Sequence, residues 1–315
     1  MKKIIRIFSF FIGFVLFCAL LIGLIPDQFS SSYQRALVKQ YDYYTSMKNN
    51  KNKIVFVGNS SLYFGLNLDE MENLTGRPCC ILGNHAGYGM TYPIEMSKAN
   101  LREGDTVVIE LVNNAPYECG SDLLLTGIGK RYDLYQYFVG DMRRQILRAY
   151  PSYLKKNFEY WLSGGYKATG AYSSESYDKR GSAIYNRPGC IIPEPFTDEV
   201  AKTYSWCRYD DYPFNKEFIS YINDYVAYCK KRNVKVYFTL QCYLDEAVKS
   251  TEANMDLRDK TLSEQLHAPL ISRTKDYIFP RKYIYDFIAH CNTNGAKVRT
   301  KLLYHDLKPY LSSMN

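Results

Sequence analysis

The sequence has little of several features that would point to particular classes of protein. Its 315 residues include only 2 Trp and 4 His, no C-x-x-C pair and no Cys/His cluster with the spacing of a zinc site. The formal net charge is +8, but the cations are scattered and form no basic run, so no nucleic-acid partner is predicted. No internal repeat is visible. We therefore expect neither a metal nor another cofactor.

The overall composition is that of a folded chain. Hydrophobic residues make up 46% and charged residues 23% of the sequence, which is the balance of a globular protein. One α/β domain of about 200–250 residues together with a membrane segment would use the whole length. The 31 Tyr are unusually many, and tyrosine suits wet binding surfaces as well as cores.

The N-terminus carries the first organisational signal. Lys2, Lys3 and Arg6 precede an almost uninterrupted apolar run from Ile7 to Pro26, whose length of about 20 residues matches a membrane span. A cleaved signal peptide, the alternative, has a shorter apolar region and an A-x-A-like site. We expect an uncleaved transmembrane signal anchor over residues 1–26. The cations on its N-terminal side predict a single-pass protein whose main domain is extracytoplasmic, either periplasmic or at the cell surface.

Alternating strand and helix patterns follow the anchor. Residues 27–52 are expected to form a juxtamembrane helix or linker, and residues 53–315 the α/β domain. Short apolar runs predict strands at 53–58, 79–83, 106–112 and 234–240, and a helical pattern covers 214–232. Such alternation is typical of a three-layer fold, in which helices cover both faces of a parallel sheet. The chemistry of such sheets lies at the carboxyl ends of the strands.

A Tyr-rich insertion interrupts this pattern at about 117–213. Its aromatic helices over 132–161 give way to a stretch rich in Gly, Ser and Tyr over 163–195. Two interpretations stay open, because long segments of this kind are often functional. The insertion is either a packing subdomain or a lid or polymer-binding wall.

The cysteines after the first 26 residues number eight, which permits disulfides. Their connectivity does not follow from the sequence. Cys229 falls on an apolar helix face and Cys242 ends a strand, so buried free thiols are an equal alternative for these two.

Two distant segments supply candidate catalytic residues. Ser60 lies in Gly-Asn-Ser-Ser directly after the first predicted strand, where a serine can act as a nucleophile if a base and oxyanion donors are near. His290 follows Asp286 by four positions and precedes a closing helix that Asn292 would cap. Alone, each is also compatible with an ordinary structural residue. Together, a serine at a strand end and an acid with a histidine far downstream favour acid–base catalysis.

These segments resemble the SGNH/GDSL hydrolases, in particular the membrane-anchored branch associated with cell-envelope polysaccharide and teichoic-acid modification. Four places carry the resemblance, in the family's order along the chain: Gly58-Asn59-Ser60, Leu82 to Met90, Glu110 to Asn114, and Asp286 to Gly295. It implies an SGNH/flavodoxin-like fold with Ser60, His290 and Asp286 as the catalytic triad. It further implies an oxyanion hole formed by Ser60 N–H, Gly83 N–H and an asparagine side chain, either Asn113 or Asn114.

Two departures from the family pattern are present. Asp286 and His290 are separated by three residues where two are usual, and the third block lacks its common Gly-x-Asn-Asp form.

The resemblance implies a serine esterase or O-acyltransferase that acts on acyl groups, acetyl above all, of a cell-envelope glycan. It also makes a membrane-bound acyltransferase a candidate partner. The alternative is a non-catalytic member of the fold that serves as a binding or assembly partner.

Overall fold

Four short apolar segments form a parallel sheet in the computed structural model, which describes residues 2–112, 119–209 and 215–311. The strands, in the spatial order β2-β1-β3-β4, are β1 (Ile54–Val57), β2 (Cys79–Leu82), β3 (Thr106–Leu111) and β4 (Lys235–Leu240). A separate parallel pair joins β5 (Tyr243–Leu244) and β6 (Ile278–Phe279). The four predicted strands are thus confirmed, and the chain has a mixed α/β architecture.

Helices alternate with these strands. They are α1 (Lys2–Leu24), α2 (Ala36–Ser46), α3 (Ser60–Gly65), α4 (Leu68–Thr75), α5 (Thr91–Ser97), α6 (Asp122–Ile128), α7 (Met142–Leu162), α8 (Asp198–Tyr204), α9 (Lys216–Lys230), α10 (Glu252–Gln265) and α11 (Thr293–Leu311). The predicted helices before β4 and at the end of the chain correspond to α9 and α11.

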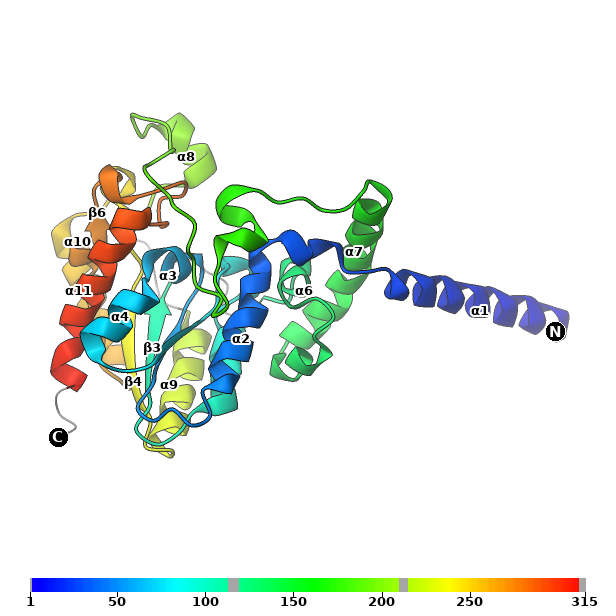
Figure 1. Ribbon diagram of the computed structural model, residues 1–315, viewed down its shortest axis with the longest axis horizontal. Helices are drawn as coiled ribbons and strands as arrows, with labels where there is room; N and C mark the ends of the chain where they lie inside the picture. The colour runs from blue at the N-terminus through cyan, green and yellow to red at the C-terminus, as the bar shows by residue number, and fades with distance from the viewer. Residues whose placement is uncertain (1, 113–118, 210–214, 312–315) are drawn as a thin grey trace.

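Both faces of the sheet are buried, because successive strand residues point to opposite sides. Val55 packs on one face with Leu37 of α2 and Ile222 of α9. Phe56 packs on the other face with Leu303 of α11. Figure 1 shows α4 and α11 on one side of the strands and α2 and α9 on the other. Burial on both faces explains why the strands are apolar throughout instead of alternating with polar residues.

Helix α2, within the segment predicted to be a juxtamembrane helix or linker, packs on the sheet. Leu37 and Tyr44 of this helix are fully buried, and Asn100 Nδ2 donates a hydrogen bond to the Tyr44 carbonyl oxygen at 2.7 Å. The large tyrosine rings in this helix serve as core side chains, although the sequence around them is polar. The helical alternative for this segment is therefore the one that the structure has, and its buried side chains join the core of the sheet.

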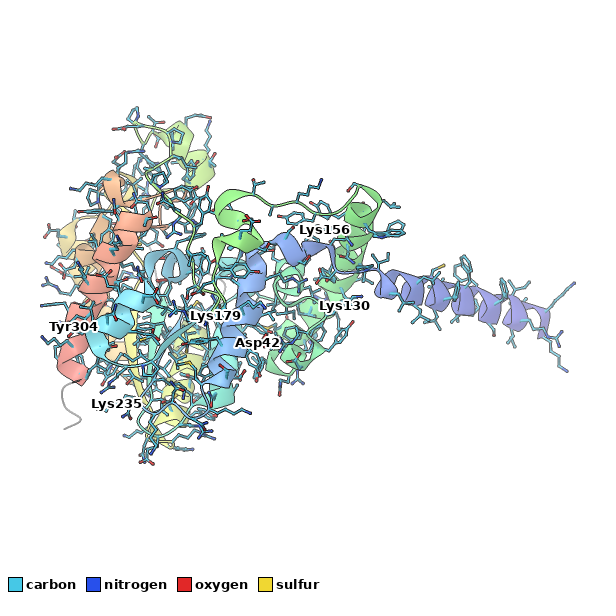
Figure 2. All side chains as sticks on the ribbon, viewed as in Figure 1. Asp42, Lys130, Lys156, Lys179, Lys235 and Tyr304 are labelled. Atoms are coloured by element: carbon cyan, nitrogen blue, oxygen red, sulfur yellow. The ribbon has the colours of Figure 1, made fainter. Side chains whose placement is uncertain are left out.

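Helix α1 extends away from the rest of the molecule (Figure 1), and its side chains stand clear of the domain along most of its length (Figure 2). Ile4 and Phe10 are 71% and 79% exposed. Among the helices in the described part of the chain, none combines the length and the hydropathy needed to cross a membrane.

The described part of the insertion packs on the segment between α1 and α2. Helix α7 lies against α6, and α6 in turn contacts α2. Gln28 N–H donates to Asn157 Oδ1 at 2.8 Å, and Ser31 Oγ donates to the Tyr166 carbonyl oxygen at 2.8 Å.

All nine cysteines are free thiols, and Cys229 and Cys242 are buried.

Candidate active site

The candidate nucleophile sits at the turn between β1 and α3. Asn59 caps α3, since its Oδ1 accepts the Ser61 N–H at 2.8 Å. A Cβ at Gly58 would lie only 2.9 Å from Leu62 Cβ and 3.2 Å from Glu110 Cβ, so the turn has no room for a larger residue. The turn therefore places Ser60, as the first residue of α3, at the carboxyl edge of the sheet.

The candidate acid and base come from one tight hairpin. The Tyr285 N–H donates to the His290 carbonyl oxygen at 2.8 Å, and the His290 N–H donates to the Phe287 carbonyl oxygen at 2.9 Å. This closure brings Asp286 Oδ1 to 2.9 Å from His290 Nδ1. The extra residue between the acid and the base is accommodated in the hairpin, so the unusual spacing does not separate them.

The structure brings the three predicted residues together in one chain of contacts. His290 Nε2 lies 2.9 Å from Ser60 Oγ, on the side of the ring opposite to Asp286. When the Asp286 carboxylate accepts a hydrogen bond from the protonated Nδ1, Nε2 of the neutral ring is left as an acceptor for the Ser60 hydroxyl. Geometrically, the serine proton has a direct route to the imidazole.

The carboxylate of Asp286 is kept ionised by its partners. Burial alone would raise its pKa, but hydrogen bonds from His290 and Tyr172 and the charge of His290 outweigh burial, so the pKa of Asp286 is lowered. The Tyr172 hydroxyl donates to Asp286 Oδ2. Burial and the charge of Asp286 raise the pKa of Tyr172, which keeps this hydroxyl protonated as a donor.

Two buried arginines that the sequence reasoning missed fix the loops around Ser60. Arg299 of α11 donates to the Ser61 carbonyl oxygen at 2.7 Å and forms an ion pair with Glu110, which lies on β3. Arg187 donates at 3.1 Å to the Phe64 carbonyl oxygen and at 3.1 Å to the carbonyl oxygen of Cys291, the neighbour of His290.

These contacts tie α3 to a strand and to the His290 hairpin. The residue pattern held no signal for either arginine, because their partners, backbone carbonyls and for Arg299 also the Glu110 carboxylate, are far away along the chain.

The residues predicted to form the oxyanion hole differ in their surroundings. The Gly83 N–H donates to Gln40 Oε1 of α2 at 2.9 Å, so its one hydrogen already has an acceptor, and the oxyanion role of Gly83 stays a prediction. Position 83 requires a glycine for two reasons. Its φ is +102°, and a Cβ there would lie 2.0 Å from the Gly58 carbonyl oxygen. Asn113 and Asn114 lie outside the described residues. For the Ser60 N–H, no acceptor is found in the described part of the chain.

His85 is a neutral donor close to this site. Its Nδ1 accepts the Gly87 N–H at 2.8 Å, so the proton of the neutral ring lies on Nε2. Burial, and secondly the charge of His290, lower the pKa of His85 to about 4. Over the described residues, no group of three or more His, Cys, Asp or Glu side chains is placed to hold a metal ion.

Comparisons with known proteins add little to this geometry. No family model matches the sequence, and the search of curated proteins gives no match. One of the solved structures that match is a Streptococcus pneumoniae protein described as a candidate platelet activating factor. It is 12% identical, with a TM-score of 0.36, over 94% of this chain and 99% of that one. A similarity at this level carries no argument about function.

Proposed function

We propose that this protein is a serine esterase or O-acyltransferase of the SGNH/GDSL type. The proposal rests on one observation above all, the contact chain from Ser60 Oγ through His290 to Asp286, with 2.9 Å at each step. A structural serine would not need a histidine that is itself oriented by a carboxylate. The order of the family-like blocks along the chain is independent support.

In the proposed reaction, Ser60 Oγ attacks the acyl carbonyl while His290 Nε2 takes the hydroxyl proton. Asp286 holds the imidazole and stabilises its positive charge. When the tetrahedral intermediate collapses, the carbon–oxygen bond to the alcohol breaks, His290 returns the proton to that alcohol, and an acyl-Ser60 ester remains. Water then gives hydrolysis, whereas a sugar hydroxyl gives transfer. The Ser60 N–H is the proposed oxyanion donor, together with Asn113 as the family resemblance implies.

The proposed substrate is an O-acyl group, acetyl above all, on a cell-envelope glycan. Aromatic rings enclose the base, with the ring of Phe64 centred 4.6 Å and that of Phe287 5.3 Å from the His290 ring. Such close apolar surroundings suit a small acyl group.

Attachment to a membrane through α1 is a further part of the proposal. The apolar side chains of α1 are exposed, and a cavity of about 570 Å³ at its end is lined by Leu24 together with Phe158 and Trp161 of α7. Aromatic residues of this kind favour the interface between lipid and water. The cations Lys2 and Lys3 would lie on the cytoplasmic side, with the main domain outside and a membrane-bound acyltransferase as a candidate partner.

The proposed activity is tested with the full chain in detergent. A fluorophosphonate probe should label the wild type and not Ser60→Ala, and p-nitrophenyl acetate should be turned over by the wild type only. Absence of both labelling and turnover would contradict the proposal. The alternative, a non-catalytic binding or assembly partner with the same fold, would then replace it.

A further inference from the structure

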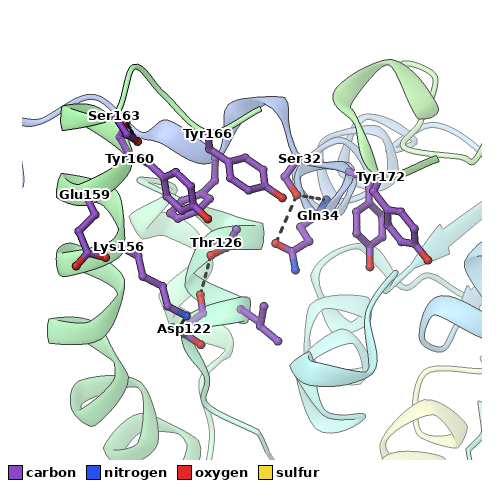
Figure 3. Close-up of a pocket in the computed structure, with 13 residues that line it drawn as sticks. Ser32, Gln34, Asp122, Thr126, Lys156, Glu159, Tyr160, Ser163, Tyr166 and Tyr172 are labelled. Atoms are coloured by element: carbon purple, nitrogen blue, oxygen red, sulfur yellow. Dashed lines mark hydrogen bonds and ion pairs between the residues drawn. The ribbon is translucent and has the colours of Figure 1, made fainter. Parts of the chain in front are cut away.

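A cavity of about 680 Å³ lies between α6, α7 and the segment that precedes α2 (Figure 3). We call it the α6–α7 cavity. Its volume is within the range of about 300–1,000 Å³ found for small-molecule sites. Ser60, Asp286 and His290, which carry the proposed chemistry, are not among its lining residues.

The α6–α7 cavity adjoins the candidate triad through Tyr172. This tyrosine lines the cavity and donates its hydroxyl proton to Asp286. Tyr33, also in the lining, has its ring centred 5.0 Å from that of Tyr172 and 6.1 Å from that of Phe64, and Phe64 packs on His290. A molecule in the cavity would therefore reach the edge of the catalytic centre.

Aromatic and polar groups share the wall of the cavity. The rings of Tyr160 and Tyr166 meet edge to face, with centroids 5.0 Å apart. The ring of Phe29, also in the lining, is centred 5.5 Å from that of Tyr160 and 5.3 Å from that of Tyr166. On the same side, Lys156 forms an ion pair with Asp122. Figure 3 shows Tyr160, Lys156 and Glu159 on one helix and Tyr172 at the opposite end.

These groups select against two classes of ligand. The one ammonium among the lining residues, Lys156, is paired with Asp122, and the other carboxylate in the lining, Glu159, is paired with Lys155, so the lining offers no unpaired cation to an anionic ligand such as a phosphate. An acyl chain would remove water from these charges without replacing their hydrogen bonds, which is costly. A pyranose ring has an apolar C–H face for a tyrosine ring and hydroxyl groups for the carboxylates.

We propose that the α6–α7 cavity binds a neutral pyranose unit of the glycan, next to the unit whose acyl group reaches Ser60. This inference rests on the proposed function and specifies its substrate class. Tyr160 is the principal stacking residue, and Tyr172 separates the sugar subsite from the triad.

Binding is tested apart from catalysis by calorimetry on the full chain in detergent, with Ser60→Ala to prevent turnover. Xylotetraose and chitotetraose, both neutral pyranose oligomers, serve as probes. At least one should bind, and Tyr160→Ala should weaken its binding about tenfold, whereas Tyr160→Phe, which keeps the ring, should stay within about threefold. Tyr132→Ala is the matched control, since Tyr132 is an exposed tyrosine outside the cavity, and it should bind as the parent does.

Two binding results would overturn the inference. One is no binding of either neutral oligomer, and the other is tighter binding of a sulfated oligomer or a long-chain fatty acid. Loss of binding in Tyr160→Ala supports the inference only if the melting temperature of the variant stays close to that of the parent. If Tyr160→Ala is destabilised, the affinity of Tyr160→Phe is compared with that of the parent instead.

Turnover separates this inference from the proposed function. With Ser60 intact, the ratio of kcat/KM for mono-O-acetylated xylotetraose or chitotetraose to kcat/KM for p-nitrophenyl acetate should fall about tenfold in Tyr160→Ala and stay constant in Tyr132→Ala. An unchanged ratio in Tyr160→Ala would overturn the cavity as a subsite and leave the esterase intact. No turnover of either ester, with binding preserved, would remove the esterase and keep the sugar site.

Discussion

His290 Nε2 lies 2.9 Å from Ser60 Oγ, although 230 positions of the chain separate the two residues. If they act as one unit, Ser60→Ala and His290→Ala should each lower kcat for p-nitrophenyl acetate by about 10³-fold or more, and the double variant should lose little beyond either single one. Asp286→Ala should cost less, about 10²-fold, because the base remains. Initial rates on purified variants are the measurement.

Ser61→Ala is the matched control for the nucleophile. The Ser61 hydroxyl is buried, with Cys242 Sγ at 3.9 Å and the Glu110 carboxylate as its hydrogen-bond partners, so this variant should keep most of the activity. Multiplicative losses in the double variant Ser60→Ala/His290→Ala would show that the two side chains act separately. A loss in Ser61→Ala equal to that in Ser60→Ala would show that the nucleophile is misassigned.

The sheet could be predicted from the sequence because its strands are short, continuous apolar runs next to turn residues, as at Val57-Gly58. A helix was predicted in the region of α2 as well, but its polar pattern did not predict that Tyr44 is a fully buried core side chain. Tyrosine has both a polar and an apolar part, so its burial depends on what it packs against. The sequence pattern alone did not contain that information.

The catalytic residues could be predicted where their signal lies in a few neighbouring residues of the sequence. Ser60 after a strand and Asp286 before His290 are each visible in a short window. The hydrogen bond from the Gly83 N–H to Gln40 could not be predicted in this way, because Gln40 is 43 positions away. Arg299 was missed for the same reason, since its function lies in a contact with the Ser61 carbonyl oxygen.

His85 should make the stability of the protein depend on pH. Its pKa is lowered to about 4 in the folded chain from 6.5, so between these values the unfolded chain binds the extra proton. Stability is therefore complete above pH 6.5 and falls as the pH decreases toward 4, by up to about 3 kcal/mol for this group. Chemical denaturation of the wild type and of His85→Asn at pH 7 and pH 4.5 measures the difference.

The asparagine oxygen can still accept the Gly87 N–H, so His85→Asn removes only the titrating ring. The variant should lose less stability than the wild type on acidification. Equal losses in the two proteins would mean that His85 titrates alike in the folded and unfolded chains.

The contributions of Arg299 and Glu110 to the stability of the protein should depend on each other. Both side chains are almost fully buried, so Arg299→Met would leave an uncompensated carboxylate in the core and cost about 3–5 kcal/mol of unfolding free energy. Arg299→Met combined with Glu110→Leu should restore part of this loss. Lys202→Ala, in an exposed pair with Glu199, should change stability by less than about 0.5 kcal/mol. Additive losses in the double variant would contradict the coupling.

Removal of residues 1–26 should abolish association with phospholipid vesicles and leave the domain folded. The exposed apolar side chains of α1, such as Ile4 and Phe10, are lost, whereas Asp27 keeps its ion pair with Arg35. The hydrogen bond from Lys130 Nζ to the Gly23 carbonyl oxygen is lost as well, but it is exposed and contributes little. Flotation with vesicles and thermal unfolding measure the two effects.

Phe10→Asp/Phe14→Asp in the full chain provides a control of unchanged length. Both phenylalanines are exposed on α1, so two carboxylates there should weaken flotation as truncation does, because charged groups enter an apolar lipid environment at high cost. The folded domain should melt as the wild type does, since neither residue packs on it. If the truncated chain floats with vesicles as a monomer, the lipid contact lies elsewhere on the domain. The aromatic residues of α7 would then be the first to be substituted.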